Sequence, residues 1–291
     1  MTVPGFWRSA LDPERVMHVD VTHWQEGEQY AREDALTVEE PFEIRINGQS
    51  LAVIMRTPGN DHELAMGFLL TEGVIQRADE IISIVDAVDE DKLPLANVVD
   101  VTLRPRGLNG NAALKPQAPA FERHFTVSAS CGLCGKTSIA DLITTTPPLE
   151  EDTLHTLHIP AAIIYTLAER LRHAQSVFEH TGGLHAAGLF DLNGELLLLR
   201  EDVGRHNAVD KLIGHGLLHG NFPYREQLLV VSGRTSFEII QKALLARIPC
   251  IIAISAPSSL AVELAERAGI TLIGFLRNHS MNVYTHPERI V

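Results

Sequence analysis

The chain reads Leu228-Leu229-Val230-Val231-Ser232-Gly233-Arg234-Thr235-Ser236 where an apolar strand gives way to a polar turn and then to a helical pattern over residues 237–246. The alternation continues with a strand over 251–255, a helix over 259–268 and a strand over 271–275. These strand segments are apolar on both faces, as parallel strands covered by helices must be. The stretch therefore predicts a three-layer α/β sandwich with a mixed sheet.

The sequence just upstream extends the same domain. Pro160 fits the first turn of a helix that runs past residue 171. A hairpin is expected over 185–190 and 195–199, with the turn formed by the Asn-Gly pair at 193–194, and a helix over 207–214 follows it. We place this α/β domain at residues 125–291.

The N-terminal part has the pattern of a smaller α+β domain, placed at residues 36–124. Alternating apolar residues predict a hairpin from Phe42 to Arg56 that turns at an Asn-Gly pair. Asn60 is expected to cap a helix, because Glu63 stands at the capping-box spacing. Two further strands are expected, over 81–85 and 98–103.

Two segments show no clear periodicity. Residues 104–117 are rich in turn-forming residues and are interpreted as the boundary between the domains. Residues 1–35 mix two tryptophans with charged residues and are interpreted as an extended N-terminal arm, to which no function is assigned.

Composition excludes several classes of protein. The 291 residues carry 24 Lys plus Arg against 37 Asp plus Glu, a net charge of −13, which argues against a broad nucleic-acid-binding surface. The longest apolar runs fall well short of the roughly 20 residues that span a bilayer, and the first residues lack the layout of a secretory signal. We therefore expect a globular cytoplasmic protein that binds neither membrane nor nucleic acid.

The sharpest candidate for chemistry is the pair Cys131 and Cys134, separated by Gly-Leu and followed by Lys136. A neighbouring thiol and a basic side chain each lower a thiol pKa and raise the fraction of nucleophilic thiolate. The pair fits half of a zinc site, a disulfide redox couple, or a thiol that accepts a sulfur atom as a persulfide. Cys250, the third cysteine, follows Pro249 at an apolar strand and is expected to be a small buried hydrophobe.

A second candidate site lies where the predicted strands of the α/β domain end. Residues 201–207, 232–236, 256–259 and 276–280 are polar and each follows such a strand. The carboxyl ends of strands in an open α/β sheet line one crevice, and helix N-termini there present N–H groups to an anion. Arg205, Arg234 and Arg277 are candidates to bind phosphate groups. The alternative is that these residues only start helices and carry surface charge.

From about Glu40 to Pro287 the chain resembles the formate dehydrogenase accessory sulfurtransferases, the FdhD/NarQ family. The resemblance rests on six segments: Glu40–Gly48, Glu63–Gly73, Cys131–Gly135, Thr181–Ala187, Glu201–Lys211 and Ser232–Ser236. It implies a sulfur carrier that takes sulfur from a cysteine desulfurase as a persulfide, with Cys131 favoured as its bearer. The sulfur would pass to bis-molybdopterin guanine dinucleotide, the molybdenum cofactor, before that cofactor enters the catalytic subunit of formate dehydrogenase.

The resemblance also implies a homodimer and a second domain similar to the cytidine deaminase fold. The family's cofactor-binding segment corresponds here to Phe275, Leu276, Arg277, Asn278, His279 and Ser280. A guanine nucleotide is expected to bind at this segment as a mimic of the cofactor, with Arg234 and Arg277 near its phosphates.

Two other functions remain open from the sequence. A chaperone that binds the cofactor without carrying sulfur would need the nucleotide site but not the thiols. A zinc deaminase would need a His-x-Glu motif and a Pro-Cys-x-x-Cys motif, whereas the corresponding helix starts read Arg205-His206-Asn207 and Gly233-Arg234-Thr235. Because these ligands are missing, no structural metal is expected.

Overall fold

The computed structural model describes residues 6–8, 14–105, 125–127, 147–150 and 157–291. The α/β domain is built on a six-stranded sheet with the order β10-β9-β11-β12-β13-β14. The three central strands β11, β12 and β13 are parallel, whereas β9 and β14 run antiparallel to their neighbours β11 and β13. The strands are β9 (His185–Phe190), β10 (Leu196–Asp202), β11 (Leu228–Val231), β12 (Cys250–Ala253), β13 (Thr271–Arg277) and β14 (Ser280–Thr285).

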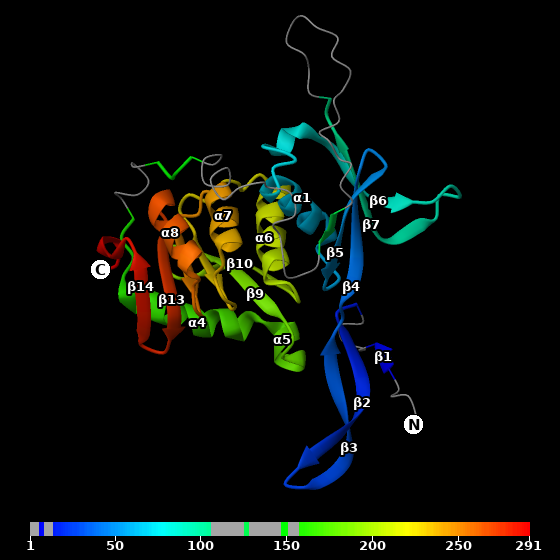
Figure 1. Cartoon of the computed structure of the whole chain (residues 1–291), viewed down its shortest axis with the longest axis horizontal. Helices are drawn as coiled ribbons and strands as arrows, with labels where there is room; N and C mark the ends of the chain where they lie inside the picture. The colour runs from blue at the N-terminus through cyan, green and yellow to red at the C-terminus, as the bar shows by residue number, and fades with distance from the viewer. Residues whose placement is uncertain (1–5, 9–13, 106–124, 128–146, 151–156) are drawn as a thin grey trace, which may run out of the picture.

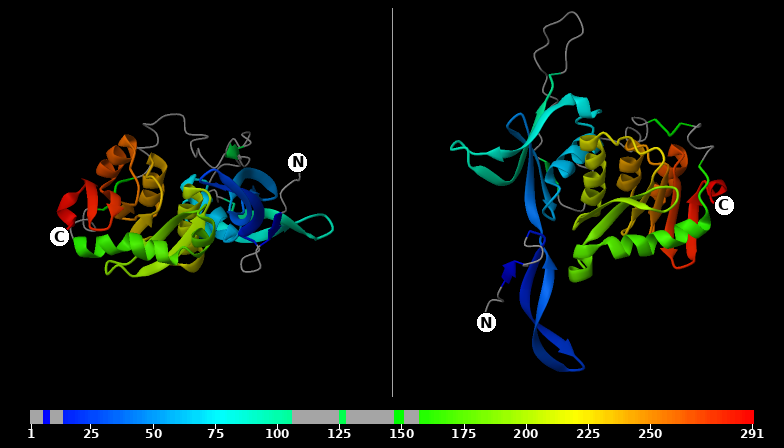
Figure 2. Two further views of the ribbon diagram at one scale, coloured as in Figure 1. Left: turned by 90° about the horizontal axis from the view of Figure 1, so that it is seen from below. Right: turned by 180° about the vertical axis from the view of Figure 1, so that it is seen from behind.

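Helices cover both faces of this sheet (Figures 1 and 2). Alternate residues of β11 point to opposite sides: Leu229 packs with the helices α6 to α8, and Leu228 packs with α4. Such alternation is what a strand buried on both faces requires. The helices are α6 (Arg205–His219), α7 (Phe237–Leu245) and α8 (Ser259–Ala268) on one face, with α4 (Ala161–Ala174) and the short α5 (Ser176–Thr181) on the other. The predicted three-layer sandwich with a mixed sheet is confirmed.

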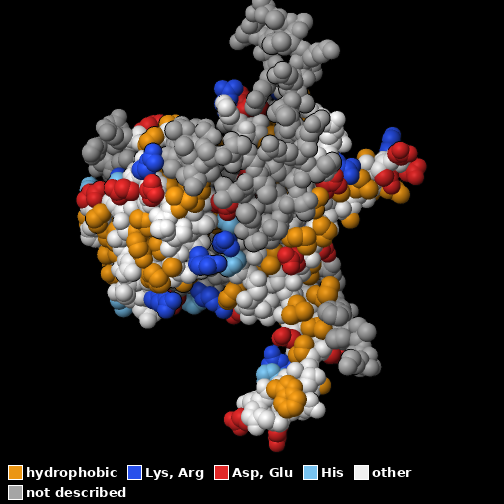
Figure 3. Space-filling view, viewed as in Figure 1, with side chains coloured by type: hydrophobic (Ala, Val, Ile, Leu, Met, Phe, Trp, Pro, Cys, Tyr) orange, Lys and Arg blue, Asp and Glu red, His pale blue; other side chains and the backbone are white. Residues whose placement is uncertain are grey.

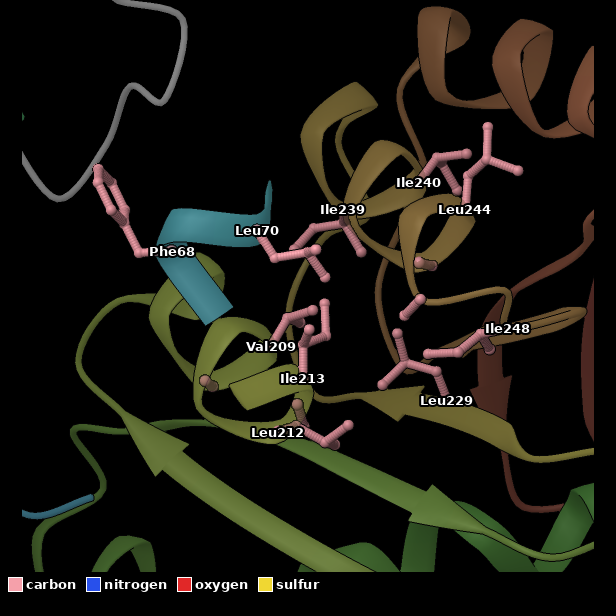
Figure 4. Packing of buried hydrophobic residues seen from close by; sticks show 14 of the residues in the cluster. Phe68, Leu70, Val209, Leu212, Ile213, Leu229, Ile239, Ile240, Leu244 and Ile248 are labelled. Atoms are coloured by element: carbon pink, nitrogen blue, oxygen red, sulfur yellow. The ribbon is translucent and has the colours of Figure 1, made fainter. Parts of the chain in front are cut away.

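The N-terminal domain has a five-stranded sheet with the order β6-β7-β4-β5-β8. Its helix α1 (Asp61–Thr71) packs against α6, so the cores of the two domains are continuous. Figure 4 shows Leu70 of α1 next to Val209 and Ile213 of α6 in this shared core. The strands are β4 (Glu40–Ile46), β5 (Gln49–Arg56), β6 (Ile81–Val88), β7 (Pro94–Leu103) and β8 (Phe125–Val127), with the 3-10 turn η1 (Ala78–Glu80) before β6.

The N-terminal arm is regular where it is described. Strands β1 (Phe6–Arg8), β2 (Val16–Gln25) and β3 (Glu28–Thr37) form an antiparallel sheet that projects from the body of the molecule (Figure 1). The hairpin of β2 and β3 forms a projecting ribbon. The start of this ribbon is anchored by Val16, which packs with Val177 and Leu184 of the α/β domain. The alternation that marks a half-buried strand is missing because most of β3 faces solvent.

Several local expectations differ from the structure. Strand β8 pairs with β5, so residues 125–127 belong to the N-terminal sheet and not to the α/β domain. Asn60 precedes α1 in the left-handed conformation, with φ of 61° and without a side-chain cap, so the expected capping box is wrong. The side chain of Glu63 bonds to Arg200 instead. The sequence did not predict α5, β14 or the final 3-10 turn η2 (Pro287–Arg289).

No helix within the described residues is long and apolar enough to cross a membrane.

Candidate functional site

The predicted catalytic residues Cys131 and Cys134 lie outside the described residues, and Val127 is the last described residue before them. Val127, the last residue of β8, pairs with Ile54 of β5. The next residue of β5, Met55, accepts a hydrogen bond of 2.9 Å at its carbonyl oxygen from the Asn207 side chain in the first turn of α6. Val127, the last described residue before the cysteines, therefore lies near the first turn of α6.

Cys250 lies at the start of β12 and is fully buried in the core under α4. Burial raises the pKa of its thiol to about 12, since the thiolate would be desolvated there. This confirms that Cys250 is a buried hydrophobe, and it is unsuited to act as a nucleophile.

Cationic side chains converge at the strand ends, around His185 at the start of β9. Burial lowers the pKa of His185 below 6.5, and the neighbouring Arg205, His206 and Arg234 lower it further. The lower part of the α/β domain in Figure 3, where the β13–β14 turn lies in Figure 1, carries the colours of Lys, Arg and His side chains. The structure thus brings together Arg205 and Arg234, two of the arginines predicted to bind phosphate.

His206, in the first turn of α6, faces the first turn of α7. Its Nε2 atom lies 2.8 Å from Glu238 Oε2 and 3.2 Å from Ser236 Oγ. The imidazole and the carboxylate are each about one-tenth exposed, so the pair is almost removed from solvent. The partners of this histidine on α7 are thus a carboxylate and a hydroxyl, whereas a deaminase site would have cysteine ligands at the following helix.

The segment Phe275–Ser280 forms the end of β13 and the turn into β14, and its residues face different environments. Phe275 is exposed with φ of 54°, and its N–H donates to Ser255 at the end of β12. Leu276 is fully buried in the core, so its side chain is not available to a ligand. His279 lies on the face of the sheet that α4 covers, with its ring 5.7 Å from that of Tyr165. Arg277, Asn278 and Ser280 are exposed.

Several residues of the segment Glu201–Lys211 join the α/β domain to the N-terminal domain, a role that the sequence analysis did not predict. Asp202 and Lys211, both of the α/β domain, form a fully buried ion pair of 2.7 Å at the boundary with the N-terminal domain. Asp202 also accepts hydrogen bonds from the backbone N–H groups of Thr57 and Gly204 and from Asn207. Lys211 donates a hydrogen bond of 2.8 Å to the Thr57 carbonyl. These residues hold the loop before α1 onto α6.

The contact between α1 and α6 contains further buried polar groups and two glycines. Asp210 of α6 pairs with Lys242 of α7 at 2.8 Å and accepts a hydrogen bond from Thr71 of α1. A Cβ atom on Gly67 of α1 would lie 1.9 Å from the Asp210 carbonyl oxygen, and one on Gly214 of α6 would lie 1.8 Å from the Glu63 carbonyl oxygen. The two helices can approach this closely only because both positions lack a side chain.

A cleft of about 670 Å³ is lined mainly by the N-terminal domain, with Leu218 near the end of α6 as its contribution from the α/β domain. Its charged lining is mostly acidic, and Arg56 in its wall is buried between Glu40 and Asp61. The sequence pattern did not indicate this cleft, because its residues come from separate strands and the start of α1.

Among the described residues, no group of three or more His, Cys, Asp or Glu side chains is arranged to hold a metal ion. Since Cys131 and Cys134 lie outside these residues, the expectation that the protein contains no zinc stays a prediction.

Comparison with known proteins places this geometry in a family. The FdhD/NarQ family matches residues 37–291. The chain belongs to the FdhD/NarQ family. It is 49% identical over 268 residues to a protein of Streptomyces avermitilis named sulfur carrier protein FdhD, which covers 91% of this chain and 92% of that protein. It is 44% identical over 281 residues to the protein of the same name from Mycobacterium tuberculosis, covering 94% and 98% of the two chains.

A solved structure supports the same assignment. The crystal structure of a "putative formate dehydrogenase accessory protein" from Desulfotalea psychrophila superposes with a TM-score of 0.71 and 25% identity. The match covers 95% of this chain and all of that chain, so the family fold includes both domains described above.

Proposed function

We propose that this protein is a sulfur carrier for formate dehydrogenase maturation, with Cys131 and Cys134 as its reactive thiols. The observation that supports it most is the Cys-Gly-Leu-Cys motif in a chain so similar, over about nine-tenths of its length, to proteins named sulfur carriers. In the first step the Cys131 thiolate attacks the outer sulfur of a cysteine desulfurase persulfide. The donor S–S bond breaks, its cysteine leaves as a thiolate, and Cys131 holds the sulfur as a persulfide.

The acceptor in this proposal is the molybdenum of bis-molybdopterin guanine dinucleotide, which binds as a substrate at the strand ends and then passes to formate dehydrogenase. In this second step the Cys134 thiolate attacks the inner sulfur of the Cys131 persulfide, the S–S bond of the persulfide breaks, and its outer sulfur leaves as sulfide for the metal. Cys131 and Cys134 are left as a disulfide, which a cellular dithiol reductant returns to two thiols.

Val127, four residues before Cys131 in the sequence, pairs with Ile54 of β5, and the next residue of β5, Met55, contacts the first turn of α6. The exposed Phe275, Arg277, Asn278 and Ser280 and the exposed Arg234 lie at the ends of strands of the same sheet. This arrangement supports a transfer from the cysteine segment to a cofactor held there.

The proposal includes a homodimer and a cytidine-deaminase-like fold for the α/β domain, as the family resemblance implies. It does not include deaminase chemistry. His206 is paired with Glu238 across α6 and α7, and the sequence at the start of α7 contains no cysteine that could complete a zinc site.

The persulfide step is tested by intact mass after incubation with a cysteine desulfurase and cysteine. The parent protein is expected to gain a sulfur atom that reductant removes, and Cys131→Ala is expected to abolish the transfer while the protein stays folded. Cys250→Ala is the matched control, because Cys250 is a buried thiol outside the motif and its loss should leave the transfer intact. Full formate dehydrogenase maturation by Cys131→Ala would favour the chaperone function instead.

The cofactor site is tested by calorimetry with GDP as the probe. The Arg277→Ala and Arg234→Ala variants are each expected to lose a contact with phosphate, worth roughly 1.5–3 kcal/mol or about tenfold to a hundredfold in affinity. ADP serves as the comparison for recognition of the base. If GDP binds no better than ADP, or if both variants bind as tightly as the parent, the cofactor is held elsewhere.

A further inference from the structure

The helices that begin at the strand ends differ in how their N-termini are satisfied. Helix α8 is capped by Ser258, whose Oγ accepts a hydrogen bond of 3.2 Å from the N–H of Ala261. Helix α6 begins after Gly204, which has no side chain to cap it, and its first turn has no acidic residue. The first N–H groups of a helix have no partner within the helix. Asp202 accepts the N–H of Gly204, and the N–H groups of the first turn that follow have no side-chain cap, so they are open to an acceptor from outside the helix.

Two arginines next to this N-terminus, Arg205 and Arg234, form no ion pair with any residue that the structure describes. The Nε atom of Arg205 is buried, and no described residue accepts a hydrogen bond from it. Two carboxylates at the start of α6 and of α7 are already engaged: Asp202 bonds to Lys211, and Glu238 lies 2.8 Å from His206. A buried guanidinium N–H without an acceptor is costly. Its position therefore points to an acceptor that is supplied by a ligand.

Gly233, between β11 and α7, leaves room for His185 and Arg205 to approach the backbone closely. A Cβ atom there would lie 3.1 Å from Nδ1 of His185 and 3.6 Å from Cδ of Arg205. Gly233 is not in a left-handed conformation, so its value at this position is the close approach of the two side chains. His185 and Arg205 thus lie side by side on Gly233, with Arg234 next in the chain.

We propose that Arg205, His185 and Arg234, together with the N-terminus of α6, form a binding site for a phosphoryl anion. The inference rests on the proposed function, since it assigns the pyrophosphate of the bound nucleotide to these residues. The inference goes beyond the proposed function because Arg205, His185 and the N-terminus of α6 lie outside the segment Phe275–Ser280. A local cluster of this kind is needed because the protein as a whole carries a net charge of −13 and repels anions.

The ligand chemistry is shared by free phosphate, pyrophosphate and the phosphates of a nucleotide, and calorimetry with separate probes distinguishes them. The probes are inorganic phosphate, inorganic pyrophosphate, GDP and guanosine. The test variant is Arg205→Gln. The control is Arg225→Gln, since Arg225 is an exposed arginine just before β11, at the opposite end of the strand from Arg234. Urea unfolding of both variants shows whether each keeps the parent's fold.

Pyrophosphate and GDP are expected to bind the parent and Arg225→Gln equally well, and to bind Arg205→Gln roughly tenfold or more weakly. Guanosine should not distinguish the three proteins. Arg205→Lys, which keeps the charge but not the planar fork, should show an intermediate loss and is the second variant if Arg205→Gln fails to fold. Phosphate that binds as tightly as GDP, with the same loss in Arg205→Gln, would support the site and identify free phosphate as its ligand.

Three outcomes would contradict the inference in different ways. Equal binding of pyrophosphate by Arg205→Gln and the parent would overturn the site. GDP binding that falls in Arg277→Ala but not in Arg205→Gln would overturn the site and leave the proposed function standing. If neither GDP nor pyrophosphate binds the parent protein, both the site and the nucleotide part of the proposed function are wrong.

Discussion

Two sets of residues within Glu201–Lys211 do different work although they alternate along one stretch of sequence. Asp202, Asn207 and Lys211 point into the boundary between the domains, where they hydrogen bond to each other and to the loop before α1. Arg205 and His206 lie at the strand ends, close to His185. The first set joins the two domains, and the second places a guanidinium and an imidazole at the strand ends.

The difference between the two sets lies in how their polar atoms are satisfied. At the domain boundary, two buried ion pairs satisfy the charges of four side chains: Lys211 bonds to Asp202, and Lys242 bonds to Asp210. At the strand ends, by contrast, Arg205 Nε has no acceptor among the residues that the structure describes. Buried polar groups normally have hydrogen-bond partners. The partnered charges at the domain boundary therefore indicate a role in stability, and the unpartnered Nε of Arg205 indicates a role in binding.

The largest effect is expected at the domain boundary, from Lys211→Met. This change leaves the carboxylate of Asp202 fully buried without its cation, and removing one partner of a buried ion pair costs about 3–5 kcal/mol. Urea unfolding measures the loss. Lys92→Met, at an exposed lysine, is the control and should change the free energy of unfolding very little.

The double variant Asp202→Asn with Lys211→Met sharpens this test. It removes both charges, so it should be more stable than Lys211→Met alone. If Lys211→Met loses less than about 1 kcal/mol, the pair is not a stabilising link and the distinction between the two sets of residues fails.

A smaller loss is expected from Gly67→Ala on α1. Alanine favours a helix over glycine by roughly 0.5–1 kcal/mol, so propensity alone predicts a more stable protein. The new methyl group would instead meet the Asp210 carbonyl at 1.9 Å, and the helices must separate. Overpacking of this kind costs about 1–3 kcal/mol, measured by urea unfolding. A stabilised Gly67→Ala protein would show that α1 and α6 are not held this closely.

The sequence predicted the α/β domain well because its elements have strong periodicity. The helix over 259–268 is observed with the same bounds, and the strand predicted over 271–275 extends to Arg277. The projecting ribbon β2–β3 was missed because a mostly exposed strand carries no alternation of apolar and polar residues. Strand β8 was assigned to the wrong domain because three residues cannot show which sheet they join.

The site was predictable to a similar extent, and for the same reason. Polar residues after apolar strands indicated the strand ends, and Arg205 and Arg234 do come together around His185. The role of Lys211 was hidden, because its partner Asp202 and the Thr57 carbonyl come together only when the two domains pack. A lysine at a buried helical position, nine residues after an aspartate, was the one available signal.

The smallest effect is expected on the pKa of His185. It tests whether Arg205 lies beside this histidine at the strand ends. Burial, followed by the charge of Arg205, lowers the pKa of His185 below 6.5, with His206 and Arg234 acting in the same direction and Asp202 opposing them. NMR titration of the imidazole in Arg205→Gln should therefore give a pKa closer to 6.5 than in the parent. An unchanged pKa would mean that the guanidinium does not lie beside the imidazole.

The same shift sets the sign of a stability change with pH. Between the lowered pKa of the folded protein and 6.5, the unfolded chain binds more protons at His185, so stability falls as the pH drops through this window. His185→Gln removes this contribution and should lose less stability than the parent between about pH 7.5 and about pH 5.5 in urea unfolding.

A bound phosphate would favour the protonated imidazole, so pyrophosphate should raise the pKa of His185 in the parent and much less in Arg205→Gln. An equal rise in both proteins would place the anion elsewhere and leave His185 and Arg205 as neighbours without a common ligand.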